Sequence, residues 1–380
     1  MLPAVLCAQN YENSRELTPI TGRPTDLVSL ALNPPLGLPE MDIPPRNPIT
    51  HARVKLGRKL FFDRRLSFNR TLSCAMCHIP EQGFTQYEVK TPVGIEGRFV
   101  NRNSPSLLNV GYRRVLFHDG REDSLENQVW QPLLKPNEMA NPSIGFVLAT
   151  VRDDAEYVAL FRATFPQGLT AETLGMALAS YQRGLVAADS PFDRWFFQGD
   201  QNALSAAATL GFELFKNKGC SGCHTLGEDH AHFTDDNFHD TGIGYARSME
   251  KSGRLETVRL APGVTVKPTV TFEMPESNDL GRYEATANSA DRWLYRTPTL
   301  RNVAITGPYM HDGSLPTLGA VVAYYNAGGV PHGGQDPRIR PLHLTAAQQG
   351  QLVAFLQSLT GSTVPALVSD ARSERIRDWD

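Results

Sequence analysis

The amino-acid sequence predicts a mainly α-helical protein of two similar units in tandem, with a small β-hairpin inserted in the second. Apolar residues recur at helical spacing in segments 54–63 and 208–216. Both segments contain the pattern Leu-Gly-x-x-Leu-Phe, and each leads into a Cys-x-x-Cys-His motif. A shared pattern before a shared motif indicates an internal duplication.

The two Cys-x-x-Cys-His motifs are attachment sequences for c-type haem. Each pair of thiols can form thioethers to the haem vinyl groups, and the histidine then becomes the proximal iron ligand. The residues are Cys74, Cys77 and His78 in the first motif and Cys220, Cys223 and His224 in the second. A lone motif could be a zinc half-site or a redox dithiol, but two copies use four of the five cysteines. We therefore expect two cytochrome c-like domains, each with one covalent c-type haem.

Length and charge exclude several classes of protein. A chain of 380 residues can form two domains, each with its own core. The net charge is −3 with the signs interspersed, which gives no electrostatic case for nucleic acid or an anionic membrane. No run of about twenty apolar residues is present, so no membrane span is predicted.

The first residues resemble the end of an export signal. Residues 1–8 read as the tail of a cleaved secretory signal that is largely absent from this chain. Cys7 is the only cysteine outside the haem motifs; it is either a lipid-anchor site or a stray residue near a processing site. Because haem is attached to this motif outside the cytoplasm, we expect a periplasmic or exported protein.

The remaining elements follow in order along the chain. Residues 1–49, rich in Pro, Asn and Thr without a sustained period, predict an extended arm on the surface. The two units are predicted at 50–198 and 199–361, with a charged surface tail at 362–380. Alternating Val and Thr around a Pro-Gly turn predict the β-hairpin at 255–272. Further helices are predicted at 124–134, 145–151, 155–164, 171–187, 317–325 and 346–359.

Four further segments carry a resemblance to a known family. They are Asn-Arg-Asn-Ser-Pro-Ser-Leu-Leu-Asn at 101–109, Phe-His-Asp-Gly-Arg at 117–121, Arg-Thr-Pro-Thr-Leu-Arg-Asn at 296–302 and Gly-Pro-Tyr-Met-His-Asp-Gly-Ser at 307–314. With the two haem motifs, the chain resembles the bacterial dihaem cytochrome c peroxidase/MauG family over roughly residues 50–361. The resemblance implies an enzyme that uses H2O2.

The resemblance assigns the open face of the first haem to three residues. A peroxidase needs a free coordination position and an acid–base group that moves a proton between the peroxide oxygens. The family spacing falls on Glu138 as general acid–base, Gln128 as its hydrogen-bonding neighbour and Pro132. An arbitrary glutamate here would be a solvated loop carboxylate; the spacing and the following Met139 favour the functional interpretation.

The loop at 90–100 departs from the ordinary peroxidases of the family. They carry a histidine there that caps the first iron until the second haem is reduced, whereas this loop has none and Glu96 would be a weak substitute. We therefore expect a first haem that meets peroxide without reductive activation. This departure favours the MauG branch.

The second haem is expected to carry a tyrosine opposite His224. In the peroxidase branch a methionine lies fourteen residues after the His-Asp-Gly histidine; that position here is Tyr325, as in MauG-like proteins. A phenolate is a hard anionic donor that stabilises high-valent iron, whereas a thioether favours reduced iron. Met310 is a second candidate that we interpret as packing, and Tyr324 and Tyr325 could both be core aromatics.

The resemblance also implies a calcium ion between the haems. Asn103, Thr306 and Pro308 match its family ligands through one side-chain oxygen and two carbonyls, a donor set that suits Ca²⁺. A packing role for these loop residues is the alternative.

Two positions put the family's electron-transfer route in doubt. His118 and Lys218 stand where relatives have tryptophan. Trp130, Trp195 and Trp293 are candidate replacements, or core aromatics. The histidines that follow the second haem, which we interpret as solvated or facing propionates rather than binding a metal, are His230, His232 and His239.

Three functions are weighed against these residues. The favoured one is a MauG-like oxidoreductase in which H2O2 produces a high-valent dihaem state that oxidises an aromatic residue, by resemblance tryptophan, of a partner protein. The alternative is a dihaem cytochrome c peroxidase that takes electrons from a small cytochrome or cupredoxin. An open first haem beside Glu138 argues against a third, a simple electron carrier. The missing loop histidine and Tyr325 favour the first.

Overall fold

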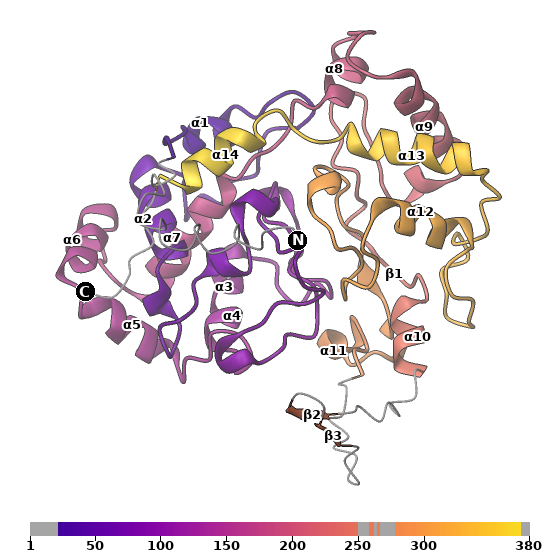
Figure 1. Cartoon of the computed structure of the whole chain (residues 1–380). Coiled ribbons are helices and arrows are strands. Elements are labelled where there is room, and N and C mark those ends of the chain that lie inside the picture. Colours follow the sequence, from indigo (N-terminus) through magenta and orange to yellow (C-terminus); the bar gives the residue numbers. More distant parts are fainter. Residues whose placement is uncertain (1–21, 250–257, 262–263, 267–277, 374–380) are drawn as a thin grey trace, which may run out of the picture.

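The computed structural model describes residues 22–249, 258–261, 264–266 and 278–373. In the first half of the chain the helices are α1 (Leu27–Leu32), α2 (His51–Phe61), α3 (Leu125–Gln128), α4 (Trp130–Leu134), α5 (Ile144–Arg152), α6 (Ala155–Thr164) and α7 (Ala171–Arg183). The later helices are α8 (Pro191–Phe197), α9 (Ala206–Asn217), α10 (Ile243–Met249), α11 (Tyr283–Thr286), α12 (Leu318–Asn326), α13 (Ala346–Gln357) and α14 (Val364–Ala371). In Figure 1, α1–α7 gather on one side of the molecule and α8, α9, α12 and α13 on the other.

The longer predicted helices are confirmed, and the helices that were not predicted are short. The predicted segments correspond to α2–α7, α9, α12 and α13. The unpredicted helices α1, α8, α10, α11 and α14 span at most eight residues. So short a segment contains too few turns for its periodicity to be recognised.

The glycine of the repeated Leu-Gly-x-x-Leu-Phe pattern lies where two long helices cross. α2 packs against α7, and α9 packs against α13. A Cβ atom on Gly57 would lie 1.9 Å from the carbonyl oxygen of Ala177, and one on Gly211 would lie 2.0 Å from that of Gln351. Only glycine permits this approach. The duplication therefore preserves the helix pair that precedes each haem motif.

Each helix pair belongs to its own hydrophobic core. The first core contains Phe61 and Tyr181 from α2 and α7. The second is strongly aromatic and contains Phe192, Phe212 and Phe355 from α8, α9 and α13. Core packing thus groups α8 with the second unit, although the predicted boundary at 198 left it in the first.

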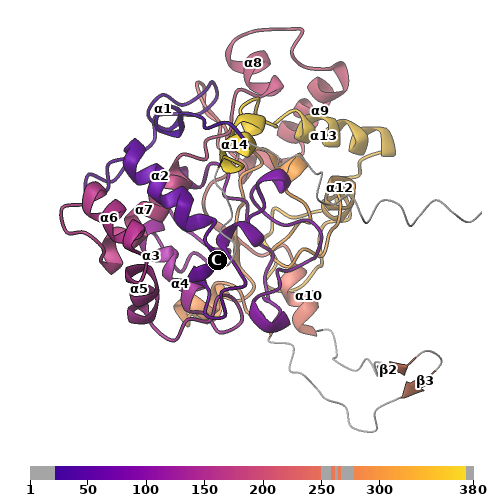
Figure 2. The same cartoon turned by 60° about the vertical axis from the view of Figure 1, so that its left-hand side comes forward.

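The prediction of a surface tail at 362–380 is wrong for its described part. α14 returns to the first unit, where Leu367 and Asp370 are fully buried. Figures 1 and 2 show it beside α1. Arg58 Nη1 lies 2.6 Å from Asp370 Oδ1, and Arg372 pairs with Glu81. The described charges of this segment, Asp370 and Arg372, therefore pair with residues distant in the sequence.

The described part of the N-terminal arm, residues 22–49, also differs from the expected surface strap. It contains α1, and its apolar side chains enter the first core. Asp26 begins the helix by accepting a hydrogen bond from the Ser29 amide at 2.9 Å. The arm is an integral part of the first unit.

Strands are few and short in the described chain. The predicted hairpin is present as β2 (Val258–Ala261) and β3 (Val264–Val266), paired antiparallel; its Pro-Gly turn lies outside the described residues. A second antiparallel pair joins β1 (Phe238–His239) and β4 (Tyr295–Arg296). None of the described helices is long and apolar enough to cross a membrane.

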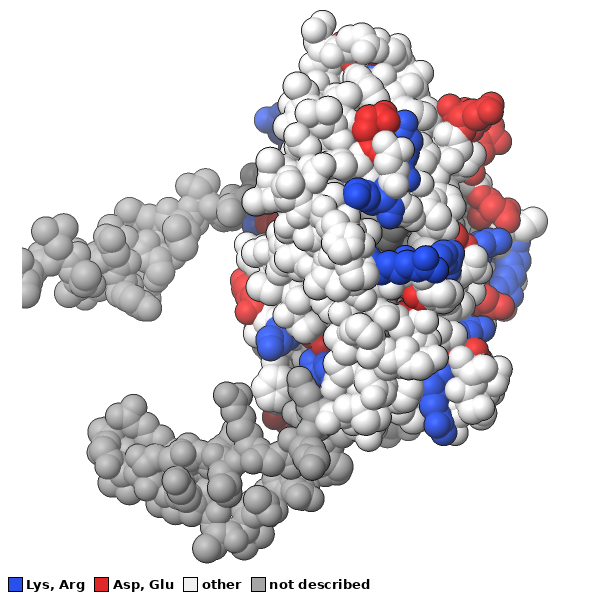
Figure 3. Space-filling view, turned by 90° about the vertical axis from the view of Figure 1, so that its right-hand side faces the viewer, with Lys and Arg blue, Asp and Glu red and all other residues white. Residues whose placement is uncertain are grey.

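The outer face of the second unit is largely uncharged. Figure 3 looks onto the side where α9, α12 and α13 lie, and shows basic and acidic side chains scattered among uncharged ones. This face offers no continuous basic tract of the kind that binds nucleic acid.

Candidate functional site

The first Cys-x-x-Cys-His motif opens into a cavity of about 400 Å³. Cys74–Met76 forms a 3₁₀ turn, which presents Cys74, Cys77 and His78 to this space. The other predicted residues of the first haem are in the same lining, namely Gln128, Pro132 and Glu138. Residues about sixty positions apart in the sequence therefore line the same cavity.

The second motif repeats this arrangement around a cavity of about 310 Å³. Cys220–Gly222 forms the matching 3₁₀ turn, and Cys220, Cys223 and His224 line the cavity. Both candidate iron ligands, Tyr325 on α12 and Met310, also line it.

Both motif histidines are held in the same tautomer. His78 Nδ1 lies 3.1 Å from the carbonyl oxygen of Phe84, and His224 Nδ1 lies 2.9 Å from that of Phe233. Since a carbonyl only accepts, each Nδ1 must donate and each Nε2 keeps its lone pair. Phe84 and Phe233 both adopt φ of +54°, a left-handed conformation that is rare for aromatic residues. No pattern in the sequence predicted these two carbonyl contacts.

Burial keeps these imidazoles neutral. It lowers the pKa of His78 to about 4 and also lowers the pKa of His224. A neutral imidazole is the form that binds iron. The paired thiols, the oriented histidines and the cavity beside each set together fit a covalently attached haem.

The predicted acid–base group lies at the edge of the first cavity. The Glu138 carboxylate is 3.2 Å from Lys135 Nζ, and its side chain is 24 % exposed. Its backbone carbonyl accepts a hydrogen bond from the Ile95 amide at 3.0 Å. Burial raises the pKa of Cys77 to about 12, and the nearby charge of Glu138 adds to this shift. The carboxylate thus lies close enough to the haem attachment point to act on its electrostatics.

The loop at 90–100 brings no ligand into the first cavity. Glu96, the weak substitute, pairs with Arg98 and its side chain is 55 % exposed; it is not part of the lining. Among the described lining residues the only imidazoles are His78 and His118. His118 Nε2 lies 3.0 Å from the carbonyl oxygen of Asn103, so this nitrogen is already occupied.

In the second cavity the two neighbouring tyrosines differ in position. The hydroxyl of Tyr324 donates to the carbonyl oxygen of Thr241 at 2.6 Å, and Tyr324 is not part of the cavity lining. Tyr325 faces the cavity; burial raises its pKa, and Tyr324, Cys220 and Cys223 contribute to the increase. Tyr325 is therefore the tyrosine that lies near the attachment cysteines.

One wall is shared by both cavities, and it contains a residue that the sequence did not single out. His118, Asn103 and Arg113 line both spaces. Burial, and then the charge of Arg296, lowers the pKa of Arg113 to about 9. Its buried Nε has no hydrogen-bond partner among the described residues. A half-buried guanidinium whose buried Nε–H is free suits a carboxylate such as a haem propionate.

The predicted calcium ligands lie together on the second cavity. Asn103, Thr306 and Pro308 all line it. The Asn103 amide nitrogen donates to the carbonyl oxygen of Lys90 at 2.9 Å, which leaves its side-chain oxygen for a cation. An amide oxygen with backbone carbonyls fits the preference of Ca²⁺ for oxygen ligands.

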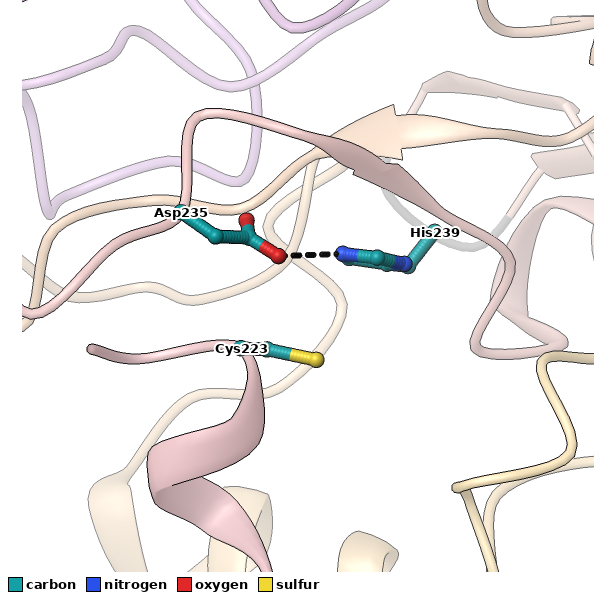
Figure 4. Close-up of side chains that lie close together, drawn as sticks. All are labelled: Cys223, Asp235 and His239. Atoms are coloured by element: carbon teal, nitrogen blue, oxygen red, sulfur yellow. Dashed lines mark hydrogen bonds and ion pairs between the residues drawn. The ribbon is translucent and has the colours of Figure 1, made fainter.

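The histidines after the second motif have protein partners. His239 lies 2.9 Å from Asp235 through Nε2 and 2.9 Å from Asp336 through Nδ1. Figure 4 shows it with Asp235 and Cys223, whose ligand atoms all lie within 4.8 Å of one another. A haem thioether would use Cys223, so this trio does not form a separate metal site. His230 pairs with Asp229, and His232 lies beside Tyr112.

The candidate residues for electron transfer lie in different parts of the fold. Lys218 lines the second cavity and donates to the carbonyl oxygen of Leu342 at 2.9 Å. Trp130 packs against the first core, and Trp195 belongs to the aromatic cluster of the second. Trp293 lies outside both cores, against Tyr245 and His332.

Comparison with known sequences places the chain in one family. The family described as "Di-haem cytochrome c peroxidase" matches residues 51–202. The methylamine utilization protein MauG of Methylorubrum extorquens is 36 % identical, over 83 % of this chain and 80 % of that protein. Cytochrome-c peroxidase IdrP1 of Denitromonas iodatirespirans is also 36 % identical, over 89 % of each chain. Cytochrome c551 peroxidase of Pseudomonas aeruginosa is 33 % identical, over 83 % of this chain and 80 % of that protein.

Solved structures agree with this placement. A MauG-like protein associated with microbial copper homeostasis superposes with a TM-score of 0.72 and 29 % identity, over 90 % of this chain and 98 % of that one. The diheme peroxidase BthA of Burkholderia thailandensis, 24 % identical with a TM-score of 0.67 over 87 % and 93 % of the two chains, shares the fold. The chain belongs to the di-haem cytochrome c peroxidase/MauG family of H2O2-dependent di-haem oxidoreductases.

Proposed function

We propose that this chain is a MauG-like enzyme that uses H2O2 to take electrons from an aromatic residue, by expectation tryptophan, of a partner protein. The observation that supports this proposal is that the two cavities are lined by different candidate ligands and acid–base groups. The first has Glu138 and no histidine from the 90–100 loop, whereas the second has Tyr325 in its lining with His224. One haem site is thus suited to peroxide and the other to holding oxidising power.

Residues of the first cavity handle the proton. Haem bound there supplies the redox centre at which peroxide is cleaved. The Glu138 carboxylate takes a proton from one peroxide oxygen and returns it to the other, so that water can leave. Lys135 holds that carboxylate at 3.2 Å, Gln128 would offer its amide to peroxide, and Pro132 completes the wall. His78 and His224 would each hold one haem iron through Nε2.

Residues of the second cavity set its redox character. Tyr325 would hold the second haem iron together with His224, because a hard anionic oxygen donor stabilises oxidised iron. Asn103, Thr306 and Pro308 are proposed to hold Ca²⁺ beside this cavity, and Arg113 to pair with propionates from the shared wall. The enzyme is proposed to act in the periplasm.

The alternative is a cytochrome c peroxidase that reduces H2O2 with electrons from a small cytochrome or a cupredoxin. Relatives named cytochrome c peroxidase, at 30–36 % identity, favour it. Catalysis would then require electrons to enter through the second haem, a task better served by a thioether ligand than by Tyr325.

One experiment separates the two functions. Stoichiometric H2O2 is added to the diferric protein, and the absorption spectrum is followed without any reductant. The proposed function predicts a rapid change to a long-lived state oxidised by two equivalents. A protein that stays inert until it is half-reduced, and then turns over with reduced cytochrome c, would establish the peroxidase instead.

A further inference from the structure

A row of aromatic side chains begins in the wall between the two cavities. The Tyr295 ring stacks on the His311 ring, with centroids 3.7 Å apart and planes at 11°. Both residues line the second cavity. The Tyr295 hydroxyl donates to the carbonyl oxygen of Asp279 at 3.2 Å, and Asp279 lines the first cavity. Tyr295 therefore reaches from one cavity towards the other.

Trp293 lies against the same glycine of α10 as the Tyr295 ring. A Cβ atom on Gly244 would lie 2.8 Å from Tyr295 Cε2 and 3.2 Å from Trp293 Cβ. The Tyr295 ring and the Trp293 Cβ atom thus flank one point of α10, and the residue at that point has no side chain.

The row ends at the surface on α10. The Trp293 ring meets Tyr245 edge-on, with centroids 5.2 Å apart, and His332 at 5.7 Å. Tyr245 in turn stacks on His332 at 4.1 Å. Trp293 and Tyr245 are both only half-buried, so an electron donor can approach them.

The surroundings of Trp293 suit a ring that carries positive charge. Its Nε1 donates to Ser248 Oγ at 3.0 Å, so the indole can keep its proton when it loses an electron. His332 Nε2 lies 3.1 Å from the fully buried carboxylate of Asp240. His332 thus contacts both the indole and this carboxylate.

We propose that Trp293 is a surface relay that passes electrons from the substrate into this enzyme, with Tyr295 between Trp293 and the cavities. The proposal rests on the proposed function and names its electron path. Trp293 gives one electron inward to the peroxide-oxidised haem pair and becomes a radical cation, which one electron from the substrate at the α10 surface then refills. Two such transfers supply the two electrons that, with two protons, convert H2O2 into two molecules of water.

The test follows both the spectrum and the site of oxidation. H2O2 is added to the wild-type holoenzyme without any donor, and tryptophan oxidation is mapped by peptide mass spectrometry. We expect Trp293 to be oxidised several-fold more than Trp195 or Trp130. In Trp293→Phe the oxidised state should persist several-fold longer, and in Trp293→Tyr its decay should be restored. Trp195→Phe is the matched control and should decay as the wild type does.

The outcomes distinguish failure of the Trp293 relay from failure of the proposed function. A normal spectral reaction with no preference for Trp293, or with wild-type decay in Trp293→Phe, overturns the relay alone. Absence of any spectral reaction with H2O2 overturns the proposed function and the relay together. Haem content and thermal denaturation of each variant show that it is folded.

Discussion

At the scale of single residues, Glu138 is the sharpest test of the first cavity. Glu138→Gln keeps the size of the side chain but removes its charge and its capacity to carry a proton. We expect the reaction with H2O2 to slow by about 10²–10⁴-fold, the usual contribution of a general acid–base group, with both haems still attached. Stopped-flow absorption measures this rate.

A glutamate of the neighbouring loop provides the control for that prediction. Glu96 is exposed and paired with Arg98, so Glu96→Gln should react at the wild-type rate. If Glu138→Gln also reacts at that rate, Glu138 is not the acid–base group.

Tyr325 and Met310 compete for one role at the second haem. Tyr325→Met exchanges a hard donor for a thioether and should raise the reduction potential of this haem. Tyr325→Phe removes the donor and should alter the haem spectrum. Spectroelectrochemical titration checks both expectations. Met310→Leu should change neither; if it alone shifts the potential, the two assignments exchange.

At the scale of elements, the two glycines at the helix crossings are equivalent. Gly57→Ala and Gly211→Ala each push a methyl group into a backbone carbonyl about 2 Å away. Overpacking of this kind typically costs about 1–3 kcal/mol of folding free energy. We expect both variants to denature at clearly lower temperature, as followed by circular dichroism.

A third helical glycine distinguishes crowding from helix propensity. A Cβ on Gly350 in α13 would meet open space. Gly350→Ala should therefore stabilise the protein slightly, by about 0.5–1 kcal/mol. Loss of stability in Gly350→Ala as large as in Gly211→Ala would show that contact at the crossing is not the cause.

At the scale of the whole molecule, a buried ion pair joins the arm, α8 and the second haem unit. Both Arg301 and Asp193 have fully buried side chains, with their atoms 2.9 Å apart. Arg301 also donates to the carbonyl oxygens of Gly37 and Ala231. Removing one member leaves the other charge buried without a partner, which typically lowers the free energy of unfolding by about 3–5 kcal/mol. Asp193→Asn should accordingly lower the denaturation temperature strongly.

Two variants show whether the cost comes from the stranded charge. The double variant Asp193→Leu with Arg301→Met should lose less stability than Asp193→Asn, because no unpaired charge stays buried. The exposed Lys216–Glu213 pair provides the comparison: Lys216→Met should change stability by less than about 1 kcal/mol. Equal losses in the double and single variants would contradict the argument.

Periodicity and motif spacing predicted most of the helices because long amphipathic segments repeat their pattern over several turns. They did not reveal α14, whose charged residues look solvent-facing in sequence but pair with Arg58 and Glu81 in space. Nor did they reveal Arg113, which resembles any surface arginine until the fold buries it between two cavities. Such residues depend on contacts that no local pattern records.

The sequence by itself determined that two covalent haem motifs stand in duplicated helical units, because thioether attachment and axial ligation need fixed residues at fixed local spacing. It also predicted that the two halves differ: the loop at 90–100 has no histidine, and Tyr325 stands where the peroxidase branch has a methionine. Only the tertiary structure decided which side chains meet. It places Glu138 and Tyr325 in different cavities, and brings Tyr295 and Trp293 against the same glycine of α10. The physical reason is that these contacts join segments far apart in the chain, and packing alone brings them together.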